Sequence, residues 1–440
     1  MSLIPALIMA AQVVVPSQRQ LAWHDMEYYA FVHFGPNTFT AQEWGSGLED
    51  PKVFNPTQLD TRQWAKTFKN AGMKGVIITA KHHDGFCLWP SKYSTHTVSQ
   101  SPFKRDILKE LAASCKEFGI KLGVYLSPWD RNHPTYGTDE YNEVFKNMLR
   151  EVLSGYGPIF EVWFDGANGE GPNGKKQVYD WPGFIGVVRE LQPMAVIFSD
   201  AGPDVRWVGN EAGHSDPTCW STLNRDLFVP GSPLYAQLTK GHEGGSHWVP
   251  AECDVSIRPG WFWRATEDGK VKSPETLLDL YLRSVGQNGS FLLNVPPDKR
   301  GLIHENDVQS LLKFKELRNA MFAKPISIKG MTASSGDPSG LTDNRRDTFW
   351  SPSPGAATHW VKFDVLRGSQ IRTVVLQEAI QFGQTVTSFA VTGGEEIAKG
   401  TTIGAKRIFH LKNPVTVDQL ELRIMSSRGP VRLASVQFYQ

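Results

Sequence analysis

The sequence predicts a (β/α)8 barrel of the TIM type, somewhat irregular, followed by a C-terminal β-sandwich. Helix-like and strand-like segments alternate over roughly the first three hundred residues, and polar residues gather after the carboxyl ends of the strand-like runs. Beyond them, short runs of alternating polar and apolar residues are separated by turn residues at the spacing of a sandwich. The expected domains are residues 1–324, the barrel, and residues 325–440, the sandwich.

The composition narrows the kinds of partner. The chain has 440 residues, 40% of them hydrophobic, and its 46 Lys and Arg balance 45 Asp and Glu. Because there is no basic block and no run of eighteen apolar residues, we expect no nucleic-acid partner and no membrane span. The ligand is expected to be neutral. The fourteen tryptophans are core anchors in the simplest interpretation, but an excess near polar loops also suits stacking against sugar rings.

The cysteines and the amino terminus say little about metal sites, disulfides or localisation. Cys87, Cys115, Cys219 and Cys253 show no CxxC or CxxH spacing, so we expect free thiols, no zinc site and no disulfide scaffold. The short apolar stretch within residues 1–18 has no Lys or Arg before it and does not resemble a signal peptide. Met1-Ser2-Leu3 is interpreted as a replacement for a removed leader. A periplasmic or secreted location is expected only from the function inferred below.

After a first strand at 29–35, four units of helix followed by strand can be recognised. In the first unit Asp60 is the expected N-cap, Trp64 and Phe68 recur at helical spacing, and Gly72 ends the helix. The four predicted pairs are 60–72 with 75–80, 107–119 with 121–127, 141–155 with 159–165, and 184–191 with 195–200. Such alternation predicts parallel strands.

Three more strands complete a count of about eight, at 205–209, 248–257 and 290–295. The last is preceded by a helix with Ser273 as N-cap and Pro274 at its first position. The span 205–248 is poor in helix, so we expect the barrel to be irregular there. No GxGxxG motif follows the first strand, which argues against a doubly wound dinucleotide-binding sheet.

A last helix at 305–322 ends before Pro325, where the character of the sequence changes. The strands expected beyond it are at 360–365, 373–376, 419–424 and 432–438. This region has no cluster of catalytic residue types, so we interpret it as a docking or carbohydrate-binding module.

Asp165 is the first candidate for chemistry. It ends the strand-like run Glu161-Val162-Trp163-Phe164 and precedes Gly166, the position at which a barrel strand opens onto its active face. The competing interpretation is a turn-capping Asp-Gly pair. Because Trp163 lies two residues earlier, it points to the same side as Asp165 and offers an aromatic wall beside the carboxylate.

A carboxylate beside an aromatic wall suits a sugar. If the protein cleaves glycosidic bonds, it needs a second carboxyl group, and the sequence offers four candidates. Glu211 stands in a glycine-flanked polar loop, whereas Glu243, Glu252 and Asp254 follow further along the chain. Glu252 and Asp254 lie in a more apolar run, where orienting a neighbour such as Arg258 is as plausible as proton transfer.

Four histidines, His33, His82, His83 and His133, are the remaining polar candidates. His82 and His83 are adjacent, so in a strand they would diverge and could not easily bind one metal ion. At a strand end both can serve hydroxyl recognition, because each ring offers a donor and an acceptor. No metal ligand set and no cofactor are predicted.

Five motifs resemble the α-L-fucosidases of glycoside hydrolase family 29, over about residues 20 to 300. They are Phe31-Val32-His33-Phe34-Gly35, Glu43-Trp44, Lys81-His82-His83-Asp84-Gly85-Phe86, Val162-Trp163-Phe164-Asp165-Gly166 and the segment Asp254-Val255-Ser256-Ile257-Arg258-Pro259-Gly260-Trp261-Phe262. The resemblance implies retaining, metal-independent hydrolysis of terminal α-L-fucose in fucosylated oligosaccharides.

The resemblance also implies roles for single residues. Asp165 matches the nucleophile, and the segment Trp207-Val208-Gly209-Asn210-Glu211 resembles the branch that cleaves α-1,3 and α-1,4 linkages, which points to Glu211 as acid/base. Positions that bind fucose hydroxyls or line the pocket are matched by His33, Trp44, His82, His83 and Arg258, with Trp163 beside the nucleophile and Trp129 and His133 matched more loosely.

Two other classes stay open from the sequence. One is a fucose-binding, lectin-like protein that uses the same residues without catalysis. The other is a metal-dependent barrel hydrolase, which no HxH or HExxH spacing supports.

Overall fold

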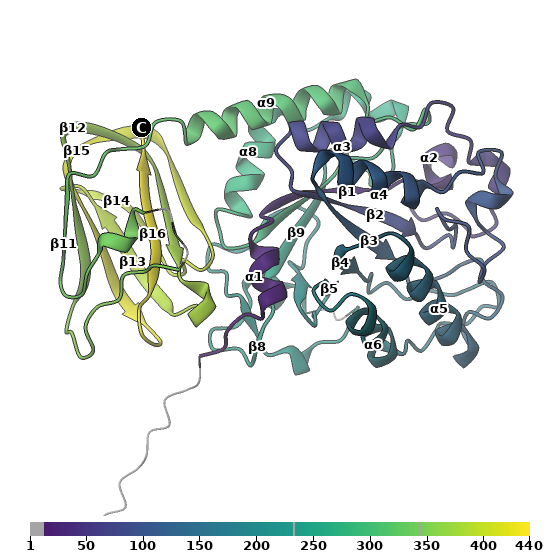
Figure 1. The fold of residues 1–440 in the computed structure, drawn as a ribbon, viewed down its shortest axis with the longest axis horizontal. Helices are drawn as coiled ribbons and strands as arrows, with labels where there is room; N and C mark the ends of the chain where they lie inside the picture. Colours follow the sequence, from purple (N-terminus) through teal and green to yellow (C-terminus); the bar gives the residue numbers. More distant parts are fainter. Residues whose placement is uncertain (1–12, 232–233, 344, 346) are drawn as a thin grey trace, which may run out of the picture.

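The computed structural model describes residues 13–231, 234–343, 345 and 347–440, with the barrel on the right and the sandwich on the left of Figure 1. Most of the apolar amino-terminal stretch discussed above, residues 1–12, lies outside the described residues. Within the described part, no helix is both long and apolar enough to cross a membrane. The four cysteines are free and buried.

Eight parallel strands close into a barrel, as predicted. Every neighbouring pair is parallel, and the strands are rich in apolar residues because both faces of the sheet are covered. In order around the barrel they are β1 (Tyr28–Val32), β10 (Ser290–Asn294), β9 (Ala251–Ser256), β6 (Val205–Trp207), β5 (Val196–Ser199), β4 (Ile159–Trp163), β3 (Lys121–Leu126) and β2 (Gly75–Lys81).

The helices begin and end at the predicted signals. Asp60 caps α3 by accepting from two backbone N–H groups, Gly119 ends α4 in the left-handed conformation, and Ser273 caps α8. The helices are α1 (Gln18–His24), α2 (Pro36–Thr40), α3 (Thr61–Asn70), α4 (Ile107–Phe118), α5 (Asp139–Gly155), α6 (Trp181–Leu191), α7 (Tyr235–Lys240), α8 (Pro274–Arg283) and α9 (Glu305–Met321), with short 3-10 turns between them.

The barrel is irregular where the sequence is poor in helix. Among the described residues only a short turn, 200–204, joins β5 to β6, and the connection from β6 to β9 holds the two-residue strands β7 (Thr222–Leu223) and β8 (His247–Trp248) with the short α7. The predicted strand 248–257 is therefore wrong at its start. Pro250 has no backbone N–H to donate, Trp248 pairs with Thr222 in the small antiparallel sheet of β7 and β8, and the barrel strand begins at Ala251.

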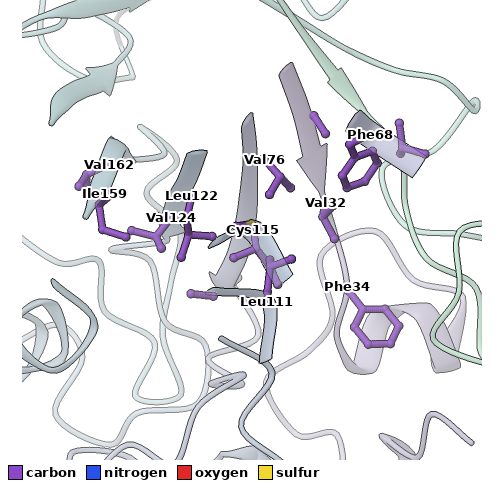
Figure 2. Close-up of a cluster of buried hydrophobic side chains, with 14 of the residues drawn as sticks. Val32, Phe34, Phe68, Val76, Leu111, Cys115, Leu122, Val124, Ile159 and Val162 are labelled. Carbon is purple, nitrogen blue, oxygen red and sulfur yellow. The ribbon is translucent and has the colours of Figure 1, made fainter. Parts of the chain in front are cut away.

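Alternation along the strands produces two cores. Side chains that face outward, such as Val76 and Val124, pack beneath Phe68 of α3 and Leu111 of α4, in the cluster that Figure 2 shows. Those that face inward fill the barrel, and most are aromatic: Tyr29, Phe31, Tyr125, Trp163 and Phe198, with Ile77 and Leu292. The strand register thus decides which side chains can reach the end of the barrel.

The C-terminal domain is an antiparallel β-sandwich in the order β11 (Gly330–Ala333), β12 (His359–Glu378), β15 (Arg407–Ser427), β13 (Val386–Thr392) and β14 (Glu396–Gly400), with β16 (Leu433–Tyr439) on β12. Several of the short strands predicted there are segments of two long ones: β12 and β15 shift register between Asp364 and Ser369, which lets the sheet bend over its own core. The predicted domain boundary at 324/325 falls between the end of α9 and the start of β11.

Candidate active site

Inward-facing residues form successive layers that end in a pocket. Along β4, Glu161, Trp163 and Asp165 alternate, and along β1 Tyr29 and Phe31 lead to His33. The pocket at the carboxyl ends of the strands is lined by Phe31, His33, Glu43, Trp44, His82, His83, Tyr125, Trp163, Asp165, Glu211, Asp254 and Trp261. None of these lining residues is Lys or Arg.

The pocket is small, with a cavity volume of ≈ 70 Å³. Larger hollows of ≈ 390 and ≈ 750 Å³ lie elsewhere, lined by residues of the barrel and sandwich and by residues around α4. Those hollows do not bring together the residues predicted to carry chemistry. The candidate site is therefore identified by the chemistry of its side chains rather than by its size.

Asp165 is held in one orientation. The hydroxyl of Tyr125 donates to Oδ2 at 3.0 Å, and the backbone N–H of Ala167 donates to Oδ1 at 2.8 Å. Nε2 of His83 lies 3.7 Å from Oδ2. The carboxylate lies just beyond the end of β4, next to Trp163, on the side predicted from the alternation.

Hydrogen bonds assign the tautomers of two histidines. The Ser127 hydroxyl donates to the Trp129 carbonyl at 2.9 Å, so it accepts from Nδ1 of His83 at 2.7 Å. The Asn294 amide nitrogen donates to two oxygens, so its Oδ1 accepts from Nδ1 of His33 at 2.9 Å. Both rings therefore carry the proton on Nδ1, and each Nε2 has a lone pair that can accept from a ligand hydroxyl.

His82 and His83 both reach the pocket, although they are adjacent. The pairing of β2 with β3 shifts register between Thr79 and Lys81, and β2 ends at Lys81. The two rings lie 4.2 Å apart, with His82 stacked on Tyr125 at 5.7 Å. A bulge at the strand end thus releases the alternation that would send them to opposite faces.

The three pocket histidines are neutral at ordinary pH. Burial lowers the pKa of His33 to about 3 and of His83 to about 4, and it lowers the pKa of His82 well below 6.5. As neutral rings they can exchange hydrogen bonds with hydroxyl groups without adding positive charge to the pocket.

Two further acids face Asp165 across the pocket. Burial, followed by the charges of Asp165 and Glu43, raises the pKa of Glu211, which stands in the loop after β6. Asp254 accepts from Nε1 of Trp207 at 2.9 Å, and burial followed by the charge of Glu211 raises its pKa well above the usual value. The site therefore combines the Asp165 carboxyl, which is held by two hydrogen-bond donors, with two further acids whose pKa values are raised.

Aromatic side chains form the walls. Trp163 lies between Tyr125 and Phe198, with ring centroids 5.2 and 3.9 Å away, and its position against the barrel interior is fixed. Trp44 is 57% exposed and stands at the mouth of the pocket, edge-on to Trp129 at 5.9 Å. Trp129 itself packs on His83 at 4.8 Å and supports the wall from behind.

Three predicted ligand-binding residues lie outside the pocket lining: Trp129, which packs behind His83, and also Arg258 and His133. Arg258 turns away into the protein, where its guanidinium pairs with Asp307 at 2.9 Å and Asp268 at 2.8 Å. Nε2 of His133 is engaged with the Tyr93 carbonyl at 3.0 Å, and Nδ1 with Thr135. The structure therefore places the side chains of Arg258 and His133 in contacts outside the lining, with Nη2 of Arg258 buried and without a hydrogen-bond partner among the described residues, and their sugar-binding roles stay predictions.

The alternative acids, Glu252 and Glu243, are also outside it. Glu252 lies beneath the floor, where it accepts from Nε1 of Trp163 at 2.7 Å and from the Tyr29 hydroxyl. Burial raises its pKa and that of its neighbour Glu161. Glu243 is exposed in a turn. Neither carboxyl lines the pocket that Asp165 and Glu211 share.

Four lining residues had no assigned role in the sequence analysis: Phe31, Glu43, Tyr125 and Trp261. Tyr125 could have been found, because it is an aromatic residue with a polar end near the close of a predicted strand. Trp261 and Glu43 stand in loops, and their contacts join segments more than two hundred residues apart. No local pattern carries that information.

A sugar ring in this pocket would meet aromatic walls, neutral hydrogen-bonding rings, and the carboxyl groups of Asp165 and Glu211. Glycoside hydrolases use a pair of carboxyl groups for bond cleavage, and TIM-barrel enzymes carry their active sites at the carboxyl ends of the strands. The fold and the pocket together therefore define a TIM-barrel glycoside hydrolase. Within the described residues, no group of three or more His, Cys, Asp or Glu is arranged to hold a metal ion.

Comparisons with known proteins agree with that class. The model of the alpha-L-fucosidase family matches residues 12–316. Alpha-L-fucosidase 1 of Arabidopsis thaliana is 44% identical over 448 residues, which cover 97% of this chain and 87% of that protein. The chain belongs to the α-L-fucosidase family, glycoside hydrolase family 29, and is an α-L-fucosidase-type hydrolase of fucosylated glycans.

Solved structures share the whole architecture. The crystal structure of SpGH29 superposes with a TM-score of 0.93 at 34% identity, covering 98% of this chain and 99% of that one. A Ruminococcus gnavus GH29 fucosidase in complex with fucose superposes with a TM-score of 0.88 at 30% identity, covering 98% and 96%. The barrel and the sandwich therefore recur together, and the lectin-like alternative is not favoured.

Proposed function

We propose that the protein is a retaining exo-α-L-fucosidase that removes terminal α-1,3- or α-1,4-linked L-fucose from branched oligosaccharides by double displacement. Asp165 is the nucleophile and Glu211 the acid/base. The observation that carries this assignment is that both carboxyls line one small pocket, where Asp165 is oriented by two hydrogen-bond donors and the pKa of Glu211 is raised.

The reaction has two steps. In the first, an oxygen of Asp165 attacks the anomeric carbon while Glu211 transfers its proton to the departing glycosidic oxygen, leaving a fucosyl ester on Asp165 and an anionic Glu211. In the second, Glu211 removes a proton from water, whose oxygen attacks the same carbon and releases fucose and free Asp165. Two inversions retain the anomeric configuration.

The neutral rings hold the sugar in line for attack. The Nε2 lone pairs of His33 and His83 accept from fucose hydroxyls, and His82 contributes a third polar edge. Trp163 and Trp261 contact the apolar face of the ring, and Trp44 at the mouth contacts the next sugar. The similarity to the Ruminococcus gnavus enzyme solved with fucose supports this use of the pocket.

Two features support the exo mode and the linkage. The pocket is small, with a volume of ≈ 70 Å³, so it suits the single sugar at a chain end. The segment Trp207-Val208-Gly209-Asn210-Glu211 resembles the branch of the family that acts on α-1,3 and α-1,4 linkages.

A product assay tests this proposal. The enzyme is incubated with a Lewis-type trisaccharide and, separately, with a simple α-1,2-linked fucoside, and the anomer first released is read by proton NMR. We expect cleavage of the branched substrate only, with α-L-fucose formed first. Release of the β-anomer would rule out double displacement, and preference for the α-1,2 linkage would refute the linkage assignment.

A further inference from the structure

Trp261 is fixed at three points. Its backbone N–H donates to Oε1 of Glu43, and its backbone carbonyl accepts from Nδ2 of Asn294 at 2.8 Å. Its indole Nε1 donates to Oε2 of Glu211 at 3.3 Å. A loop residue whose two backbone polar groups are both bound by side chains has little freedom to turn its ring away.

Both anchors belong to the machinery that holds the sugar. Asn294 accepts from Nδ1 of His33, so one amide connects a hydroxyl-binding ring to the Trp261 carbonyl. Glu43 lines the pocket beside Trp44 and pairs with Nη2 of Arg264 at 2.5 Å. The loops that hold Trp44, Trp261 and Glu211 are therefore joined by hydrogen bonds.

We propose that Trp261 is the positioning residue of the acid/base: its clamped backbone aims the indole N–H at Glu211 and fixes the carboxyl toward the glycosidic oxygen. This inference rests on the proposed role of Glu211. It assigns to Trp261 a task beyond forming a wall of the pocket, because a phenyl ring could form the wall but could not donate the hydrogen bond.

The bond also bears on the pH at which Glu211 can act as an acid. A donor aimed at the carboxyl stabilises its ionised form, whereas burial and the charges of Asp165 and Glu43 stabilise the protonated form. The other titratable or charged groups facing this space are Asp254, Tyr125, the neutral rings of His33, His82 and His83, and Arg264 behind Glu43. Removing the indole N–H should therefore raise the pKa of Glu211.

Trp261→Phe is the direct test, and Trp263→Phe is its matched control. Trp263 lies two residues further on, but its indole donates to Asp268 at 3.1 Å, outside the pocket lining. We expect Trp261→Phe to lower kcat/KM for an oligosaccharide about tenfold more than for an aryl fucoside with a good leaving group, because only the former needs the proton. The basic limb of the pH profile of kcat/KM should move to higher pH in Trp261→Phe. Trp263→Phe should leave this limb unchanged, and also the ratio of kcat/KM for the oligosaccharide to kcat/KM for the aryl fucoside.

Glu43 supplies a second pair of variants that does not depend on Trp261→Phe folding. Glu43→Gln removes a charge that raises the pKa of Glu211 but keeps an acceptor for the Trp261 N–H. The basic limb should therefore move to lower pH, while the ratio of kcat/KM between the two substrates stays the same. Glu43→Ala also removes the acceptor of the Trp261 backbone N–H. It should therefore lower the ratio of kcat/KM for the oligosaccharide to kcat/KM for the aryl fucoside, as Trp261→Phe does. Equal losses on both substrates in Trp261→Phe and Glu43→Ala, with an unmoved limb, would overturn the proposal. Failure of the Glu211 assignment itself would be recognised separately, as equal losses on both substrates in Glu211→Ala.

Discussion

The hydroxyl of Tyr125 donates to Oδ2 of Asp165 at 3.0 Å, from the strand next to the one that Asp165 follows. The backbone N–H of Ala167 donates to Oδ1, so the two hydrogen bonds together fix the orientation of the carboxylate in the pocket. The geometry of attack therefore depends on a neutral phenol whose pKa is raised by burial and by the charge of Asp165.

Tyr125→Phe should slow formation of the fucosyl ester. Loss of a hydrogen bond to a charged group costs about 1.5–3 kcal/mol, so kcat/KM should fall by about ten- to a hundredfold with the fold retained. The matched control is Tyr29→Phe, which removes a hydroxyl bound to buried Glu252 rather than to Asp165. It should lower the melting temperature and leave kcat/KM near the wild-type value. Equal activity losses in the two variants would argue against an orienting role for Tyr125.

Glu211→Ala should separate substrates by their leaving groups. Without the acid, hydrolysis of an oligosaccharide should fall by about 10²–10⁴-fold, whereas an activated aryl fucoside, which needs little protonation, should be affected far less in its first step. Added azide should restore turnover of the aryl substrate by forming a fucosyl azide. If azide has no effect and both substrates are lost alike, Glu211 is not the acid/base.

Arg258→Met tests whether that residue binds the sugar or only stabilises the fold. It leaves Asp307 and Asp268 without their cation, and breaking a buried ion pair costs about 3–5 kcal/mol. We therefore expect a lower free energy of unfolding in urea and, at a temperature where the variant is folded, a KM within a few-fold of wild type. A stable variant with a greatly raised KM would instead support the sugar-binding role first predicted for Arg258.

Acid should destabilise the fold partly through its neutral histidines. The pKa of His83 is about 4 in the fold against 6.5 when unfolded, so the unfolded chain binds more protons between these values, and stability falls as the pH drops through this window. The loss amounts to roughly 2 kcal/mol at pH 5. Buried acids with raised pKa values, such as Asp84 at about 7, act in the opposite direction, so a difference between variants is needed. His83→Asn should show a smaller drop in the free energy of unfolding between pH 7 and pH 5 than wild type; an equal drop would contradict this pKa.

The sequence predicted most of the fold because the helix signals and the period of the strands are local. Asp60, Gly119 and Ser273 act as predicted, and the pairing of Trp163 with Asp165 on one side follows from the alternation alone. Pro250 is a local signal against a strand that begins at residue 248, and the barrel strand begins at Ala251.

The site was predicted less completely, since long-range partners decide it. Arg258 follows a barrel strand, as a ligand-binding residue should, but Asp307 of α9 draws its guanidinium away. Trp261 and Glu43 meet only because the barrel closes. The roles of the site residues, the domain boundary and the periplasmic or secreted location stay predictions.

Trapping the fucosyl intermediate tests the central claim most directly. The enzyme is treated with 2-deoxy-2-fluoro-α-L-fucosyl fluoride, whose good leaving group allows the first step while the 2-fluorine slows the second, and the digested protein is mapped by tandem mass spectrometry. The predicted result is one fluorofucosyl group per chain, attached to the carboxyl of Asp165, with labelling lost in Asp165→Asn. Attachment to another residue, or inactivation without any covalent sugar, would contradict the proposed mechanism.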